Sequence, residues 1–121
     1  MTLYQKWDNM TLMKPLRWLH GEVKTPPMTT AARKELGFLL RLTQDGEALS
    51  MPQSRPMPDI GAGCHELRVT DAGGEWRLVY AVTPEAVVVL DVFKKTTRTT
   101  PQTILTRCAR RLRDYHRRDS K

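Results

Sequence analysis

Four cations on short strand-like segments are the residues of this chain best suited to chemistry. Arg68 and Arg77 lie on either side of the turn-forming Ala72-Gly73, and Lys94 and Lys95 follow an apolar run. A hairpin that turns at Ala72-Gly73 places Arg68 opposite Arg77 on one face of a sheet. Cations so placed repel one another unless an anion neutralises them. The pattern therefore favours a site for a phosphate group.

The register of the next turn decides which lysine joins the arginine pair. With a type I turn over Thr83–Ala86, Arg77 is predicted to lie opposite Val92. Lys94 then shares the face of the arginines, and Lys95 points the other way. The opposite face is predicted to pack on a helix, and it carries Leu67, Val69, Trp76, Leu78 and Tyr80.

Two carboxylates bear on this interpretation. Glu66 is two residues from Arg68 and on the same face, so an ordinary ion pair is the alternative to a phosphate site. Asp91 falls on the packed face, where the sequence offers no partner for it.

Other chemistries find little support in the sequence. It contains no P-loop, no serine-hydrolase elbow and no zinc-protease helix motif. His20, His65 and His116 are isolated from one another, and Cys64 and Cys108 lack metal-ligand spacing. We expect two reduced thiols, no metal and no cofactor.

The excess positive charge is confined to the C-terminal end. Residues 91–121 carry ten Lys/Arg against three Asp/Glu, whereas residues 1–90 carry ten of each. Thr100-Pro101 predicts a helix start with Thr100 as N-cap, and the apolar stripe that follows is Ile104, Leu105, Cys108, Leu112 and Tyr115. Arginines on the other faces favour nucleic-acid contact over a merely solvated surface. The predicted RNA-binding residues are Arg98, Arg107, Arg110, Arg111, Arg113 and Arg117.

The other elements must hold these segments in place. A chain of 121 residues with 40% apolar content is predicted to form a single domain, residues 1–121. We predict an α+β fold in which a small antiparallel sheet packs with N-terminal and C-terminal helices. The expected elements are a strand over Leu16–Val23, a helix from Thr29 or Thr30 to about Thr43, a loop over Leu49–Gly63, and strands over His65–Asp71, Glu75–Thr83 and Ala86–Phe93.

The first residues show no sustained periodicity, and residues 1–13 are predicted to form an arm. They contain no apolar run typical of a signal peptide. The longest aliphatic stretch, Ala86–Leu90, is too short to span a bilayer. We therefore expect a cytoplasmic protein without membrane contact.

Three stretches together resemble a known family. They are the residues Gly63 to Arg68 (GCHELR), Gly74 to Tyr80 (GEWRLVY) and Leu90 to Thr96 (LDVFKKT), with Pro101 following. This spaced set resembles the phage-derived, HigB-like branch of the RelE/ParE toxin superfamily. The similarity extends from about Leu16 to Tyr115.

The resemblance implies the toxin of a type II toxin–antitoxin pair with a RelE-like fold. Most such toxins cut mRNA on the ribosome, whereas ParE-like relatives poison DNA gyrase, so membership alone leaves the activity open. A third alternative is a non-enzymatic nucleic-acid-binding module. The implied partners are the ribosome, mRNA and a cognate antitoxin, expected to be a helix-turn-helix protein.

The resemblance also implies roles for particular residues in a metal-independent reaction, in which a ribose 2′-hydroxyl attacks the adjacent phosphate. Arg68 and Arg77 would stabilise charge on the phosphate, and Lys94 or Lys95 would act as base or second clamp. The family's C-terminal ending resembles Asp114-Tyr115-His116, so Tyr115 or His116 would protonate the leaving oxygen.

Overall fold

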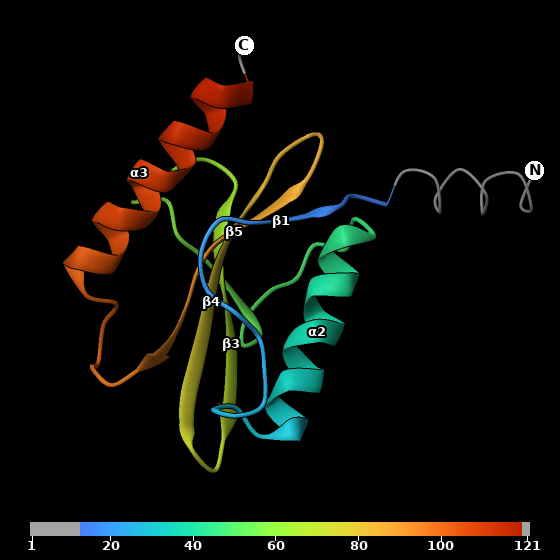
Figure 1. Cartoon of the computed structure of the whole chain (residues 1–121), viewed down its shortest axis with the longest axis vertical. Helices are drawn as coiled ribbons and strands as arrows, with labels where there is room; N and C mark the ends of the chain where they lie inside the picture. Colours follow the sequence, from blue (N-terminus) through green and yellow to red (C-terminus); the bar gives the residue numbers. More distant parts are fainter. Residues whose placement is uncertain (1–12, 120–121) are drawn as a thin grey trace, which may run out of the picture.

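A five-stranded sheet with one helix on each face forms the body of the protein. A computed structural model describes residues 13–119, so the predicted arm lies almost entirely outside the described residues. The elements are β1 (Leu16–Trp18), α2 (Thr30–Gln44), β2 (Ser54–Pro56), β3 (Cys64–Asp71), β4 (Gly74–Val82), β5 (Val87–Lys95) and α3 (Gln102–Asp119). Helices α2 and α3 cover opposite faces of the sheet (Figure 1). The predicted α+β class is confirmed.

The sheet has the strand order β1-β5-β4-β3-β2 and is mixed. Strands β3 to β5 form the predicted three-stranded antiparallel meander, and β2 pairs antiparallel to β3. The sheet was predicted to be antiparallel throughout, but β1 pairs parallel to β5. Two sequence predictions need correction here. The strand predicted over Leu16–Val23 ends at Trp18, and the loop predicted over Leu49–Gly63 contains the edge strand β2. Three-residue strands are too short to show a period, and Pro56 is tolerated because β2 lies at the edge.

Helix α2 begins and ends where its sequence predicts. Thr29 is the N-cap, and its Oγ1 accepts a hydrogen bond from the Ala32 amide at 3.1 Å. Gly46 follows the last turn with a φ of 93°, a conformation that glycine adopts without strain. The apolar stripe of the helix is buried against the sheet face formed by Leu67, Val69, Trp76, Leu78 and Tyr80.

Helix α3 buries a second apolar cluster on the other face. Its Ile104, Cys108 and Leu112 are buried, with Leu105 and Tyr115 partly buried beside them, so the predicted stripe is confirmed. The predicted cap is wrong, because the amides of Ile104 and Leu105 bond to the Pro101 carbonyl while the Thr100 hydroxyl reaches another element. No helix among residues 13–119 combines the length and apolar content needed to cross a membrane.

A bulge in β5 decides which side chains reach the α3 face. Arg68 lies opposite Arg77, as predicted. Val82 to Tyr80 pair with Val87 to Val89, but Val79 then pairs with Asp91, so Leu90 is the extra residue. Beyond the bulge every side chain of β5 changes face relative to the unbulged register.

The shifted register corrects the prediction for the two lysines. Arg77 lies opposite Phe93 instead of Val92, Lys94 lies opposite Trp76, and Lys95 lies opposite Glu75. Side chains directly opposite one another in an antiparallel pair share a face. Lys95 is therefore on the face of Arg68 and Arg77, and Lys94 is on the α2 face.

Candidate active site

A polar cleft of ≈ 390 Å³ lies beside the β3–β4 hairpin. Its walls come from both central strands, from α2 and from the segment before β2. Its lining residues are Glu35, Pro52, Gln53, Arg68, Thr70, Glu75 and Arg77. Both arginines predicted from the hairpin thus reach one cleft.

Arg77 is buried, with only 1% of its surface exposed. Its Nη2 donates to Glu75 Oε1 at 2.5 Å, its Nη1 donates to the Trp76 carbonyl at 3.2 Å, and its Nε lies 3.5 Å from Glu66 Oε1. Two carboxylates therefore hold the guanidinium. The alternative foreseen from the sequence, a pairing of Glu66 with the basic cluster, holds for Arg77.

Glu75 is the part of this charged cluster that solvent reaches, since 54% of its side chain is exposed. The hydrogen bond and charge of Arg77 lower the pKa of this carboxyl most, and the charges of Lys95 and Arg68 lower it further. Three cations thus act on one carboxylate at the cleft. Arg68 is half-buried, and its Nη1 also lies 3.6 Å from the Met51 sulfur.

Glu66 connects the cluster to the segment that leads into α3. Its carboxylate is fully buried, and its Oε2 accepts a hydrogen bond from the Thr100 hydroxyl at 3.0 Å. Thr100 is therefore committed to β3 and not to capping α3. The edge-strand residue Arg55 pairs opposite Glu66 on the same face and is exposed. Sequence reasoning missed Arg55 because it placed this segment in a loop.

Lys94 does not join the cleft. Its side chain passes over Gly74, so closely that a Cβ at this position would clash with Lys94 Cε. It is exposed on the α2 side of the sheet. Of the two predicted lysines, the structure brings only Lys95 to the arginines.

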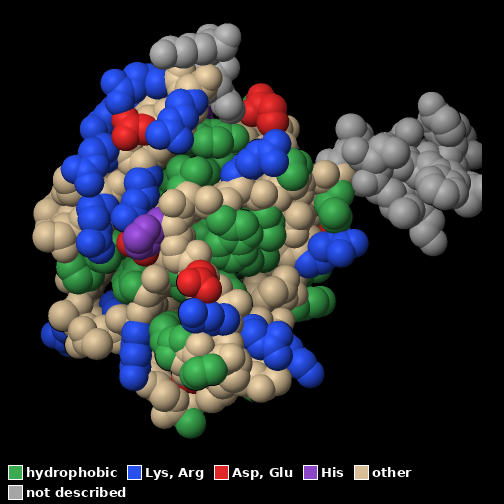
Figure 2. All heavy atoms as spheres, viewed as in Figure 1, with side chains coloured by type: hydrophobic (Ala, Val, Ile, Leu, Met, Phe, Trp, Pro, Cys, Tyr) green, Lys and Arg blue, Asp and Glu red, His purple; other side chains and the backbone are tan. Residues whose placement is uncertain are grey.

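The arginines of α3 divide into two groups. Arg111 and Arg107 face the buried carboxylate of Asp91, at 3.3 and 3.8 Å, and Arg111 Nη1 also donates to the Leu90 carbonyl at 2.8 Å. The partner that the sequence did not reveal for Asp91 is thus on α3. The other predicted RNA-binding residues do not contact Asp91 and are exposed: Arg98 in the segment before α3, and Arg110, Arg113 and Arg117 on α3, the last paired with Asp114. Lysine and arginine side chains gather over this helix in Figure 2.

Tyr115 and His116 lie toward the other end of the molecule. Helix α3 runs back along β5 (Figure 1), and the Arg111 side chain reaches the Leu90 carbonyl. From this contact α3 continues in one direction to His116, and β5 continues in the other to Phe93, which pairs with Arg77. With a rise of about 1.5 Å per helical residue and about 3.3 Å per strand residue, His116 and Arg77 are separated by a distance on the order of 15 Å. The rings of Tyr115 and His116 contact each other edge-on, with centroids 5.9 Å apart. The structure does not bring them to the cleft.

The cysteines form no reactive site. Cys64 and Cys108 are free and buried, and burial raises the pKa of the thiols to about 11 and about 12. Both therefore remain protonated at neutral pH. Within residues 13–119 no three His, Cys, Asp or Glu side chains are grouped as a metal ion would require.

The family profile of the phage-derived Gp49-like protein (DUF891) matches residues 27–113. This stretch runs from the turn before α2 into the second half of α3. The chain belongs to the Gp49-like family. The family is toxin-like and of RelE type. A search of curated proteins found no match.

The matched stretch of this Gp49-like chain contains every residue that lines the cleft, together with Lys95. It ends before Tyr115 and His116. The likeness of Asp114-Tyr115-His116 to the ending of HigB-like toxins therefore rests on the sequence comparison alone.

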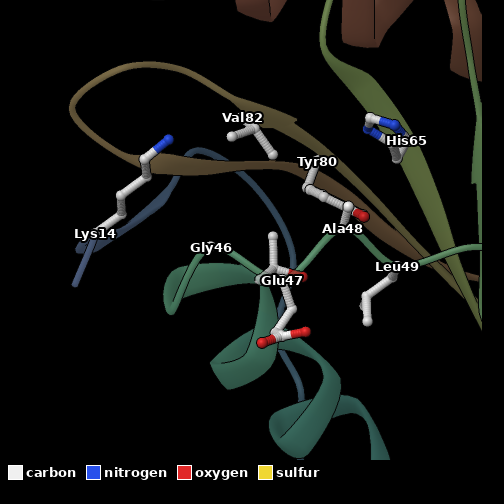
Figure 3. Close-up of a pocket in the computed structure, with 9 residues that line it drawn as sticks. Lys14, Gly46, Glu47, Ala48, Leu49, His65, Tyr80 and Val82 are labelled. Carbon is white, nitrogen blue, oxygen red and sulfur yellow. The ribbon is translucent and has the colours of Figure 1, made fainter. Parts of the chain in front are cut away.

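A second pocket of the Gp49-like protein, ≈ 270 Å³, lies on the α2 side (Figure 3). Tyr80 lies on its floor, with its hydroxyl 2.8 Å from Ser54 Oγ and its ring stacked on His65 at 5.5 Å between centroids. From the sequence, His65 was interpreted as an isolated histidine. The hairpin register that pairs Arg68 with Arg77 also pairs His65 with Tyr80, so this contact could have been found.

Proposed function

We propose that this Gp49-like protein is the toxin of a type II toxin–antitoxin system, of the HigB-like kind, and that it cuts mRNA on the ribosome. Two facts support the proposal: the family is toxin-like, and two arginines line one cleft, where the charge of Lys95 acts with theirs on an exposed carboxylate. The group of cations is the observation that supports the chemistry, because a phosphate backbone is the ligand that such a cluster suits.

The reaction needs no metal in this scheme. The ribose 2′-oxygen forms a bond to the adjacent phosphorus, the bond from phosphorus to the 5′-oxygen breaks, and the products are a 2′,3′-cyclic phosphate and a 5′-hydroxyl. Arg68 and Lys95 bind the phosphate and stabilise the charge that builds on it, an effect of about 10²–10³ in rate per donor in comparable oxyanion sites. Arg77 lies behind Glu75 and fixes that side chain.

The exposed arginines of α3 add a second surface for RNA. Helix α3 packs on the sheet face that carries Arg68 and Arg77, so one RNA-containing partner could contact both the helix and the cleft. Ribosomal RNA supplies such a polyanion, and attraction to it is non-specific in sequence. The antitoxin, which we expect to be a helix-turn-helix protein, would neutralise the toxin by covering this basic face or by preventing entry to the ribosome.

Neighbouring lysines provide the test. mRNA 5′ ends are mapped minutes after tightly controlled expression of the wild type, Lys95→Ala and Lys94→Ala. We expect new 5′-hydroxyl ends within translated frames for the wild type and Lys94→Ala, and a reduction of about tenfold or more for Lys95→Ala. The two variants remove the same charge, one residue apart, on opposite faces of the sheet. Equal effects of the two variants would argue against this site.

Growth arrest with intact mRNA and double-strand DNA breaks would instead identify a gyrase poison. No growth arrest at all would identify a nucleic-acid-binding module without toxicity. Arg77→Ala is a poor probe for this purpose, because its removal leaves the buried carboxylate of Glu66 without its cation.

A further inference from the structure

The proposed reaction requires a group that removes a proton from the 2′-hydroxyl. Among the residues lining the cleft, the arginines cannot accept a proton, and Pro52, Gln53 and Thr70 are not bases at neutral pH. The carboxylates of Glu35 and Glu75 are the remaining groups of the lining. Glu75 is bonded to Arg77 and lies opposite Lys95, so it is the carboxylate placed among the cations that would hold the phosphate.

The geometry points to Glu75 as the general base of the proposed reaction, a role that rests on the proposed function. Its Oε1 is fixed by Arg77 Nη2 at 2.5 Å, which leaves Oε2 for a second donor. Its side chain is 54% exposed, whereas Arg77 is buried, so substrate in the cleft meets the carboxylate and not the guanidinium. Arg77 is then a positioning residue that acts through Glu75.

The surrounding charges keep this carboxylate ionised, which is the form that can take a proton, although they also make it a weaker base. Arg77, Lys95 and Arg68 lower its pKa, so it is ionised at neutral pH. Lys95 lies opposite Glu75 on the neighbouring strand, and the charges of Arg68 and Lys95 both act on Glu75, so a phosphate held by these cations would lie beside the carboxylate. A base must lie within hydrogen-bond distance of the proton it takes, and the proposal requires the bound ribose to meet Glu75 at that distance.

The step balances without an oxidant or a metal. Glu75 takes the 2′-hydroxyl proton as the 2′-oxygen bonds to phosphorus, and the departing 5′-oxygen takes a proton from water. The protonated carboxyl then returns its proton to solvent, which is fast for a group whose pKa lies below the usual range.

A rival role is that of a counterion. In that case Glu75 only neutralises the cations until a phosphate displaces it, and removing its charge would strengthen phosphate binding and leave cleavage intact or faster. The two roles thus predict opposite effects of the same substitution.

The experiment uses the full chain with ribosomes programmed with a defined mRNA, and measures kcat and KM for wild type, Glu75→Gln and Glu85→Gln. The Glu75→Gln substitution keeps the length of the side chain and an oxygen that accepts from Arg77. Glu85 is exposed in the β4–β5 turn and serves as the matched control. We expect Glu75→Gln to lower kcat by about 10²–10⁴ with KM within a few-fold of wild type, and Glu85→Gln to change neither.

Each other outcome overturns the assignment. A Glu75→Gln protein that keeps or exceeds the wild-type kcat makes Glu75 a counterion, and one with altered KM alone makes it a binding residue. Thermal unfolding of each variant checks that the fold is intact. A wild-type protein that leaves the mRNA uncut refutes the proposed function instead, whatever the variant does.

Discussion

A single buried arginine organises the charged residues of the α3 face. Arg77 lies between a fully buried carboxylate, Glu66, and a half-exposed one, Glu75. Burying a cation is costly unless carboxylates and hydrogen bonds compensate it, and here both are present. The arrangement makes Arg77 part of the protein's framework as much as part of its site.

We expect Arg77→Ala to lower the free energy of unfolding by about 3–5 kcal/mol, because it leaves Glu66 as a buried, uncompensated charge. Arg68→Ala removes a half-buried cation whose loss strands no buried carboxylate, and we expect a change of about 1 kcal/mol or less. Urea unfolding of both variants measures the difference. Similar losses for the two would show that the Glu66–Arg77 pair does not carry the stability assigned to it.

The sequence predicted which residues would meet at this site better than it predicted their environment. The Arg68–Arg77 pairing followed from one turn and was confirmed. The burial of Arg77 was not foreseen, because the covering of this face depends on α3 and on the segment around Met57 and Ile60, whose positions are set by tertiary packing.

At the scale of elements, β5 shows why the face of the lysines was wrongly predicted. Its residues Val87 to Leu90 are apolar and buried on both faces, so alternation cannot fix the register. The bulge at Leu90 turns Asp91 away from the apolar stripe of α2 and toward Arg107 and Arg111. One signal of the bulge was available in the sequence: in the unbulged register Asp91 has no partner.

Asp71 joins the β3–β4 hairpin to the start of α2. Its Oδ2 accepts from the Thr29 amide at 3.0 Å and from Trp76 Nε1 at 3.1 Å, and its Oδ1 accepts from the Gly73 amide at 2.7 Å. The Thr29 bond is the main reason that the pKa of this carboxyl is lowered. The ionised form is therefore favoured by folding.

The lowered pKa gives a pH dependence of stability. A carboxyl with a depressed folded pKa contributes fully above its ordinary value of 3.8, and the contribution is lost as the pH falls through the folded value. We expect Asp71→Ala to destabilise the protein more at about pH 6 than at about pH 3. Urea unfolding at both pH values measures this, with the exposed Asp59→Ala as control. A pH-independent difference would contradict the assignment.

At the scale of the whole molecule, the sheet separates two apolar clusters, and charge is concentrated over one of them. The α+β class and the two principal helices were predictable, because their apolar stripes and helix-start residues are strong local signals. The strands β1 and β2 were not, since each has three residues and is held by pairing with distant strands. The parallel pairing of β1 with β5 in particular leaves no local pattern.

The concentration of arginine over α3 leads to a prediction about binding of nucleic acid. Arg107 and Arg111 are engaged by Asp91, so the exposed Arg110 and Arg113 are better placed to neutralise phosphates. Each lost phosphate contact on a single strand lowers the slope of log K against log salt concentration by about 0.7. We expect the double variant Arg110→Gln/Arg113→Gln to bind a short single-stranded RNA more weakly at low salt, with a slope smaller by about 1–1.5. Fluorescence anisotropy at several salt concentrations measures both quantities.

Arg41→Gln, on the exposed side of α2, is the control and should leave the slope unchanged. An unchanged slope in the double variant would mean that the arginines of α3 form only a solvated surface.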